Sequence, residues 1–237
     1  MPTAGRSDDR SLRPPGGPGD LPPRPAAVLA LRAIHALDRV RLGWLRARHP
    51  GLDLDPGASG NLAHARYALA AGARLRIAAG VVTERLRGRL HFDLGPGARV
   101  EIGEGVWLRT EIAEVHLIAF AGARIEIGPE AFLNGCHLSA KREVVLGRRA
   151  WVGLGSRVFD SDQHDLDVQR PERTERVSIG DHVWIASDVT VLRGVNIGAH
   201  AVIGTRSLVT NDVPPHGLAF GIPARVRGVV GDRSKSR

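Results

Sequence analysis

A six-residue period of aliphatic residues dominates the C-terminal half of the chain. Counting in steps of six from Ile179 gives Ile185, Val191, Ile197, Ile203 and Val209. A small or aliphatic residue stands two positions before each of these five: Val183, Val189, Val195, Ala201 and Ser207. Alternation with a period of two is typical of a strand with one buried face. Each six-residue unit is therefore predicted to contain one very short strand.

Turn-forming residues separate these predicted strands, as in Gly180-Asp181, Gly198-Ala199 and Gly204-Thr205. The same phase occurs at Leu146, Val152 and Val158, and again at Val115, Ala121, Ile127 and Leu133. Strands this short need to stack in parallel, each pairing with the equivalent strand one coil away. We therefore predict an all-β fold, a parallel β-helix over residues 60–228. A β-sandwich is the alternative, but it does not require a strict six-residue phase.

The N-terminal residues follow other patterns. Residues 1–25 are rich in Pro, Gly and Arg, which predicts a disordered tail. Over residues 26–50, apolar residues recur at helical spacing at Leu29, Ala33, Leu37, Val40 and Trp44. This amphipathic helix is expected to cap the open end of the β-helix. The alternative is contact of the basic helix 26–49 with a membrane surface. Residues 229–237 are expected to form a flexible C-terminal tail.

Composition adds constraints on the core and on possible partners. Aromatic residues make up 4% of the chain and 29 residues are Gly, which favours tight turns around an aliphatic core. The net charge of +8 suits a phosphate-bearing cofactor, but no aromatic platform accompanies the dispersed arginines, so no nucleic-acid partner is expected. The single Cys136 excludes an intrachain disulfide. Without a long apolar run or a secretion signal, a cytoplasmic location is expected.

The repeat is interrupted between Val158 and Ile179, whose separation is not a multiple of six. The interruption contains the sequence DSDQHD at residues 160–165, in which His164 is surrounded by acidic residues. Histidine is well suited to proton transfer near neutral pH, and a neighbouring carboxylate or carbonyl could fix its tautomer. A solvated loop histidine is the alternative. The spacing alone leaves both interpretations open.

Several segments of the chain resemble a known family. The repeats, the segments 183–187 (VWIAS) and 209–215 (VTNDVPP), and the segment 221–226 (GIPARV) are similar to the hexapeptide-repeat O-acetyltransferases. This family contains the maltose, galactoside and colanic acid acetyltransferases, and the resemblance covers roughly residues 95–228. It implies a left-handed β-helix, a homotrimer with active sites between neighbouring subunits, and acetyl-CoA or another acyl-CoA as co-substrate.

The resemblance also implies roles for individual residues. His164 would be the general base that takes the proton of an acceptor hydroxyl, without a covalent intermediate. Asn134, Asp160 and Asp162 would contact the acceptor, although Asn134 could instead stack within a column of turns. The expected acceptor is a sugar, a glycan or a similar small molecule with a free hydroxyl. Positions matching the family's coenzyme A site are Trp184, Ser187, Thr205, Thr210, Asn211 and Arg225.

Three alternatives remain for the chemistry of the site. Cys136 could act as a nucleophile, but its sequence context favours a small buried residue. A metal enzyme resembling γ-class carbonic anhydrase would need three converging histidines. The spacing of His116, His137, His164 and His182 does not suggest such a cluster, so no metal is expected. A non-catalytic hexapeptide scaffold would not need the inserted loop around His164.

Overall fold

The computed structural model describes residues 25–235. The tail predicted over residues 1–25 thus lies outside the described residues, except for Pro25, which begins helix α1 (Pro25–Arg48). The chain divides into two compact units, residues 1–37 and residues 38–237, and each is described by itself. Within the described part of the chain, no helix combines the length and the apolar character that a membrane span requires.

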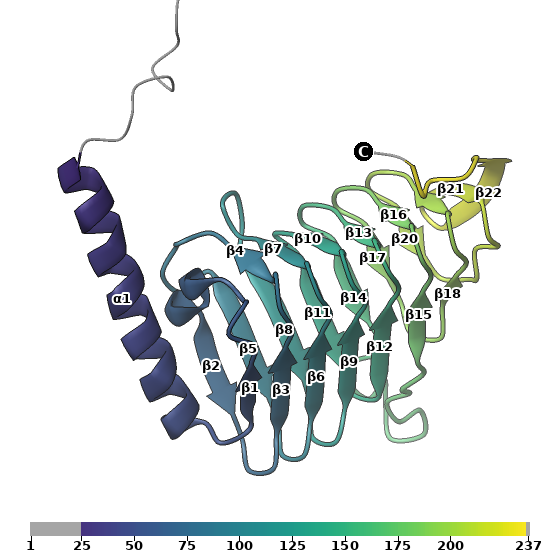
Figure 1. The fold of residues 1–237 in the computed structure, drawn as a ribbon. Helices are drawn as coiled ribbons and strands as arrows, with labels where there is room; N and C mark the ends of the chain where they lie inside the picture. The colour runs from purple at the N-terminus through teal and green to yellow at the C-terminus, as the bar shows by residue number, and fades with distance from the viewer. Residues whose placement is uncertain (1–24, 236–237) are drawn as a thin grey trace, which may run out of the picture. The chain divides into compact units, whose positions relative to one another are not determined.

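Three sheets of stacked strands form a β-helix (Figure 1). The β1 sheet contains β1 (Leu52–Leu54), β3 (Arg74–Ile77), β6 (Arg99–Ile102), β9 (Arg124–Ile127), β12 (Glu143–Leu146), β15 (Val177–Ile179) and β18 (Asn196–Ile197). The β2 sheet contains β2 (Arg66–Leu69), β5 (Leu90–Leu94), β8 (Val115–Ala119), β11 (His137–Ala140), β14 (Arg157–Phe159), β17 (Thr190–Val191) and β20 (Leu208–Val209). The β4 sheet contains β4 (Val82–Thr83), β7 (Trp107–Arg109), β10 (Phe132–Asn134), β13 (Trp151–Val152), β16 (Trp184–Ile185), β19 (Val202–Ile203), β21 (Gly217–Gly221) and β22 (Ala224–Val229).

Each coil visits the β1 sheet, then the β4 sheet, then the β2 sheet. In the first coil, the short 3-10 helix η1 (Gly60–His64) stands where later coils have a β4-sheet strand. In the regular part of the stack, Ile179 pairs in parallel with Ile197, eighteen positions later. The predicted parallel β-helix is therefore confirmed. It begins before residue 60, because β1 already pairs in parallel with β3.

The predicted six-residue phase describes the interior of the C-terminal coils. Ile185, Val191 and Ile197 have no exposed surface. The phase is wrong at Ala121, which is exposed in the turn after β8. The five-residue strand β8 buries Val115 and Ala119 on its inner face, so the extra residues of this longer strand displace the following turn.

Successive coils stack so closely that the turns between their strands need glycine. A Cβ atom on Gly180 would lie 2.7 Å from the backbone nitrogen of Ala199. On Gly198 it would lie 2.4 Å from the backbone nitrogen of Pro215. Real Cβ atoms do not approach other atoms this closely. The glycine at the start of these turns therefore makes room for the backbone of the next coil.

The part of α1 that belongs to the second unit is anchored by a different face from the one expected. Leu42 and Leu45 are buried in the main hydrophobic core. Asp38 is 3% exposed. Val40 and Trp44, which were expected on the buried face, are 72% and 58% exposed. Hydrophobic periodicity did not identify this buried face, because the first residue on it is the charged Asp38.

Asp38 is the polar anchor of this helical segment. Its Oδ1 atom lies 3.0 Å from Nε2 of His64 and 2.9 Å from Nη2 of Arg85, and its Oδ2 atom accepts a second hydrogen bond from Nε of Arg85. Burial of a carboxylate is unfavourable unless it is paired, and both partners come from the first coils of the β-helix. The hydrogen bonds from Arg85 hold the pKa of Asp38 below its usual value.

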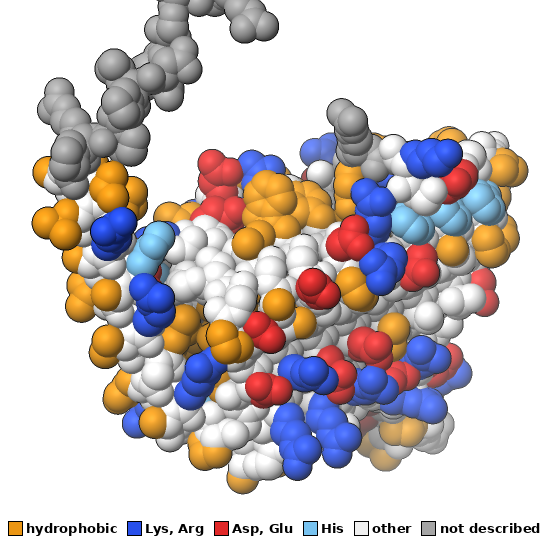
Figure 2. Space-filling model, in the orientation of Figure 1, with side chains coloured by type: hydrophobic (Ala, Val, Ile, Leu, Met, Phe, Trp, Pro, Cys, Tyr) orange, Lys and Arg blue, Asp and Glu red, His pale blue; other side chains and the backbone are white. Residues whose placement is uncertain are grey.

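The chain returns along the last coils after the antiparallel hairpin of β21 and β22. The backbone nitrogen of Val230 donates to the carbonyl oxygen of His216, and that of Arg233 donates to Nδ1 of His200. The rings of His182, His200 and His216 stack in a column with centroid distances of 5.0 and 4.8 Å, visible as a row of histidines in Figure 2. Hydrogen-bonded structure thus extends beyond residue 229, where we expected a flexible tail.

Candidate functional site

An inserted hairpin interrupts the stack between β14 and β15 (Figure 1). Val144 pairs with Val177, thirty-three positions later, so this coil carries the insertion without loss of register. The arms of the insertion pair with each other. The backbone nitrogen of Asp162 donates to the carbonyl oxygen of Arg173, and that of Glu175 donates to the carbonyl oxygen of Asp160. The β-helix therefore presents the loop without disturbing its own strands.

Asp160 anchors the first arm of this loop. The side chain has no exposed surface. Its carboxylate accepts hydrogen bonds from the backbone N–H groups of Lys141, Arg142 and Glu143, at 2.7, 2.7 and 2.6 Å. These contacts tie the loop to the turn of the preceding coil. Asp160, expected at the acceptor, thus has no surface at which an acceptor could bind.

Asp162 is partly exposed and is paired with Arg193 from the next coil. Nε of Arg193 donates to Oδ1 of Asp162 at 2.6 Å. This hydrogen bond holds the pKa of Asp162 below its usual value, with a smaller contribution from the backbone N–H of Arg173. The carboxylate is therefore ionised at neutral pH and acts as a hydrogen-bond acceptor.

His164 is exposed near the start of the loop, and its ring makes no hydrogen bond to any residue that the structure describes. Its neighbour Gln163 is firmly held. Gln163 has a φ of 70°, in the left-handed region, and its Nε2 atom donates to Oγ of Ser161 at 2.6 Å. The ammonium group of Lys141 donates to the carbonyl oxygen of Gln163 at 3.0 Å and lies 2.7 Å from Oε1 of Glu172. The backbone before His164 is thus positioned, while the imidazole is free to meet a ligand.

A groove of ≈ 510 Å³ opens beside this segment. It is lined by Phe159, Ser161, Asp162, Gln163, Leu192, Arg193 and Thr210. Three successive coils contribute to it, so the structure brings Asp162 and Thr210 together next to the residue that precedes His164. Thr210 donates a hydrogen bond of 2.9 Å from its hydroxyl to Oδ1 of Asn211.

Lys141, Gln163 and Arg193 are site residues that we did not expect. Lys141 lies one coil before the loop and Arg193 one coil after it, so both become neighbours only through the stacking of turns. The sequence contained one signal for these two residues. Each occupies a turn position about one coil away from the interruption in the repeat. Lys141 is also one of only two lysines in the chain.

The edge of the β2 sheet opposite the one beside His164 carries Asn134, Ser187 and Thr205. We call the turns that lead into this sheet its entry corner and the turns that leave it its exit corner. Asn134 ends β10 at the entry corner, and Arg206, in the turn of Thr205, donates its backbone N–H to the carbonyl oxygen of Ser187. His164 lies at the exit corner. A strand of about four residues, roughly 13 Å, separates the two corners, so one chain does not bring Asn134 and His164 together.

Asn134 also has an unused polar atom. Its Oδ1 is buried and has no hydrogen-bond partner among the described residues. Buried polar atoms are usually paired, so an unpaired amide oxygen needs an explanation. This position is compatible with a contact to a ligand or to a neighbouring subunit.

Trp184 and Arg225 occupy the C-terminal coils, away from the lining of the groove. Trp184 on β16 is 41% exposed, and the guanidinium of Arg233 lies 5.3 Å from the centroid of its ring. Arg225 is exposed in the hairpin, opposite Phe220, and donates to the carbonyl oxygen of Ala224.

Cys136 belongs to the hydrophobic core and is 2% exposed. Burial raises the pKa of its thiol to about 12. The thiolate is the nucleophilic form of cysteine, so a buried neutral thiol is not available for attack. Cys136 therefore fills space in the core.

No family model matches the chain. The galactoside O-acetyltransferase of Escherichia coli (strain K12) is 48% identical over 72 residues, which are 30% of this chain and 36% of that enzyme. The galactoside O-acetyltransferase of Lactococcus lactis subsp. lactis (strain IL1403) is 41% identical over 68 residues, which are 29% of this chain and 33% of that enzyme. The chain thus spans about a third of the length of these curated relatives.

Solved structures share the fold over a longer range. The polySia specific acetyltransferase NeuO superposes with a TM-score of 0.63 at 23% identity, over 78% of each chain. The polysialic acid O-acetyltransferase OatWY superposes with a TM-score of 0.54 at 17% identity, over 70% of this chain and 90% of that chain. At these identities the likeness concerns the fold alone. The chain therefore has the left-handed β-helix fold of these acetyltransferases and, over about 70 residues, is similar in sequence to the galactoside O-acetyltransferases.

Proposed function

We propose that this protein transfers an acetyl group from acetyl-CoA to a hydroxyl of a sugar or glycan, with His164 as the general base. The observation that carries the proposal is the inserted hairpin. It carries the exposed His164 on an anchored backbone, directly after Gln163, which lines the groove together with Thr210. The segment shared with two galactoside O-acetyltransferases supports the same activity.

The chemistry needs one base and one site for the developing negative charge. The acceptor oxygen attacks the thioester carbonyl carbon while a nitrogen of His164 takes the hydroxyl proton. A backbone N–H or hydroxyl donor stabilises the oxyanion of the tetrahedral intermediate. When the intermediate collapses, the carbon–sulfur bond breaks. The imidazolium then returns its proton to the departing coenzyme A thiolate.

The positions of the remaining residues favour a site shared between subunits. The proposed contacts to coenzyme A are Trp184, Ser187, Thr205, Thr210, Asn211 and Arg225. Within one chain these residues occupy strand β16, both corners of the β2 sheet and the C-terminal hairpin. In a homotrimer, the entry corner of one subunit can face the exit corner of the next. Asn134 would then offer its unpaired Oδ1 to the acceptor held near the neighbouring subunit's groove.

The acidic residues divide into two proposed roles. Asp162, with its ionised and partly exposed carboxylate, would accept a hydrogen bond from the acceptor. Asp160 would act as a positioning residue, because its carboxylate is fully used by backbone N–H groups. Arginines near the donor site suit the phosphates of coenzyme A, since guanidinium groups pair with phosphate through charge-assisted hydrogen bonds.

Release of free coenzyme A thiol tests this function. Purified protein is incubated with acetyl-CoA and a panel of mono- and oligosaccharides, with hydrolysis in the absence of acceptor as the blank. We expect release that depends on one class of hydroxyl acceptor, together with a trimer by light scattering. If the protein neither binds coenzyme A nor releases thiol with any acceptor, a scaffold role replaces the proposal.

A further inference from the structure

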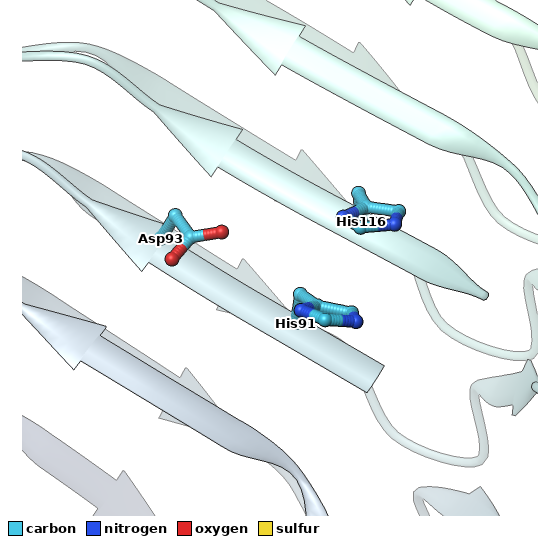
Figure 3. Close-up of side chains that lie close together, drawn as sticks. All are labelled: His91, Asp93 and His116. Atoms are coloured by element: carbon cyan, nitrogen blue, oxygen red, sulfur yellow. The ribbon is translucent and has the colours of Figure 1, made fainter. Parts of the chain in front are cut away.

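Two histidines and an aspartate come together on the outer face of the β2 sheet, in coils that precede the His164 loop. His91 on β5 and His116 on β8 are partners in register, and Asp93 follows His91 by two residues on the same face. One ligand atom from each residue lies within 4.8 Å of the others. Figure 3 shows the carboxylate of Asp93 pointing toward the two imidazoles. We propose that His91, Asp93 and His116 bind a divalent transition-metal ion such as Zn²⁺.

A fourth side chain, that of Glu114, contacts both histidines. Oε2 of Glu114 lies 3.1 Å from Nε2 of His91 and 3.1 Å from Nε2 of His116. The loop that carries Glu114 is held by Arg89, which donates to the carbonyl oxygens of Glu111 and Ile112. Histidines that bind metals commonly present their second nitrogen to a carboxylate, which fixes the tautomer and the ring orientation. Glu114 fits this role and leaves Nδ1 of each ring for the ion.

His91 is the member that most needs a partner. It is only 8% exposed, and its Nε2 atom makes no hydrogen bond within the described residues. The contact of 3.1 Å with Glu114 is close enough for an ion pair but lacks the angle of a hydrogen bond. A buried imidazole in this state is unfavourable, because buried polar groups are normally paired. Coordination of the ion by Nδ1 would leave the proton on Nε2 and fix the ring, so that Nε2 could donate to Glu114.

The donor set selects the class of ion. Two imidazoles and one carboxylate match sites for Zn²⁺ and related transition metals, whereas Mg²⁺ and Ca²⁺ prefer oxygen ligands. The carboxylates of Asp93 and Glu114 together balance the two positive charges. Three protein ligands leave a fourth position open, as in zinc sites that also bind water or a ligand. Asp93 also lines a groove of ≈ 640 Å³ that contains Phe120 and Ile118.

The rings must turn for an ion to bind. Their centroids are 4.2 Å apart and their planes are inclined by 13°, so the rings are stacked. A metal lies in the plane of each imidazole that binds it, so two parallel rings do not converge on one ion. Rotation of the partly exposed His116 would bring its nitrogen toward the ion. The competing description is a stacked pair that shares protons with Glu114 and binds no metal.

We did not expect a metal site, because the spacing of His116, His137, His164 and His182 does not suggest a cluster. His91 was not among them. It lies twenty-five residues before His116, and only the length of this coil places the two rings together. His137 is the next histidine along the same face, with its ring centroid 5.7 Å from that of His116. It lies outside the proposed ligand set and serves as a matched control.

Titration of the full-length, untagged protein with Zn²⁺ after chelator treatment tests the site, with Co²⁺ absorption as a second reading of coordination. We expect one ion per chain with a dissociation constant of about 1 µM or tighter. His116→Asn and Asp93→Asn should each weaken binding at least about 100-fold, and Glu114→Gln about 10–100-fold. His137→Asn should bind as the wild type does. Circular dichroism confirms that each variant is folded.

Two results would overturn the site. One is the absence of stoichiometric binding by the wild-type protein, which would leave the proton-sharing pair. The other is undiminished binding by His116→Asn and Asp93→Asn, which would place the ion elsewhere, for example at the column of His182, His200 and His216. Neither reading depends on acetyl transfer, so failure of the proposed enzymatic function would not alter the outcome.

Discussion

The ammonium group of Lys141 donates a hydrogen bond of 3.0 Å to the carbonyl oxygen of Gln163, the residue directly before His164. The same ammonium pairs with Glu172 on the returning arm of the hairpin. Lys141 therefore joins the turn of one coil to both arms of the loop inserted in the next. This contact holds the backbone of His164 without involving its imidazole.

Lys141→Met should lower kcat for acetyl transfer by about 10–100-fold, because small displacements of a reacting group reduce its time in productive geometry. KM for acetyl-CoA should stay within about twofold of the wild-type value, because Lys141 is outside the proposed donor contacts. Lys141→Arg keeps the charge and should retain part of the rate. Steady-state kinetics of the three proteins measure both parameters. Equal kcat values for wild type and Lys141→Met would remove Lys141 as a positioning residue.

Cys136→Ala should keep transfer within about twofold of the wild-type rate, since the thiol is buried and its pKa of about 12 keeps it neutral. A thiol reagent should react with the native protein far more slowly than with the unfolded protein. Colorimetric thiol titration with and without denaturant measures the difference. A rate loss in Cys136→Ala comparable to that of a general-base variant would restore the covalent mechanism.

The repeat pattern predicted the fold best where each unit had six residues. Ile185, Val191 and Ile197 are all fully buried because a short strand and a short turn recur without insertions. Ala121 was misplaced because the five-residue strand β8 lengthens its coil. The buried face of α1 was missed because Asp38 is buried through ion pairing, which hydrophobic periodicity does not detect.

The candidate site was predictable only in part. The break in the repeat indicated the loop, and its one histidine, His164, is the residue that we propose as the base. The anchoring contacts of Lys141 and Arg193 come from neighbouring coils, and their proximity depends on how turns stack. Asp160 shows the same limit, because nothing in its sequence context distinguishes a carboxylate that contacts a ligand from one that caps a backbone turn.

Asp38→Asn should lower the free energy of unfolding by about 1–3 kcal/mol at neutral pH, because a buried charge-assisted hydrogen-bond network loses its carboxylate. The pKa of Asp38 is lower in the folded protein than in the unfolded chain, where it is near 3.8. The stabilisation from the ionised carboxylate is therefore fully present above the unfolded-state pKa, and it is lost as the pH falls through the folded-state pKa. The stability difference between the two proteins should therefore be constant from about pH 5 upward and shrink below pH 3.8. Urea unfolding across this range measures it. A difference that grew on acidification would contradict the assignment of Asp38 as the anchor.

Acetyl transfer by His164→Ala, measured beside coenzyme A binding by the same protein, tests the role of His164 most directly. A positioned general base contributes about 10²–10⁴-fold, so the variant should lose at least about 100-fold in kcat. Its affinity for coenzyme A and its thermal unfolding should match the wild type, because the ring is exposed and makes no hydrogen bond to the described residues. His137→Asn, on the same sheet but away from the groove, should retain activity. Near-normal turnover by a folded His164→Ala protein would contradict the proposed mechanism.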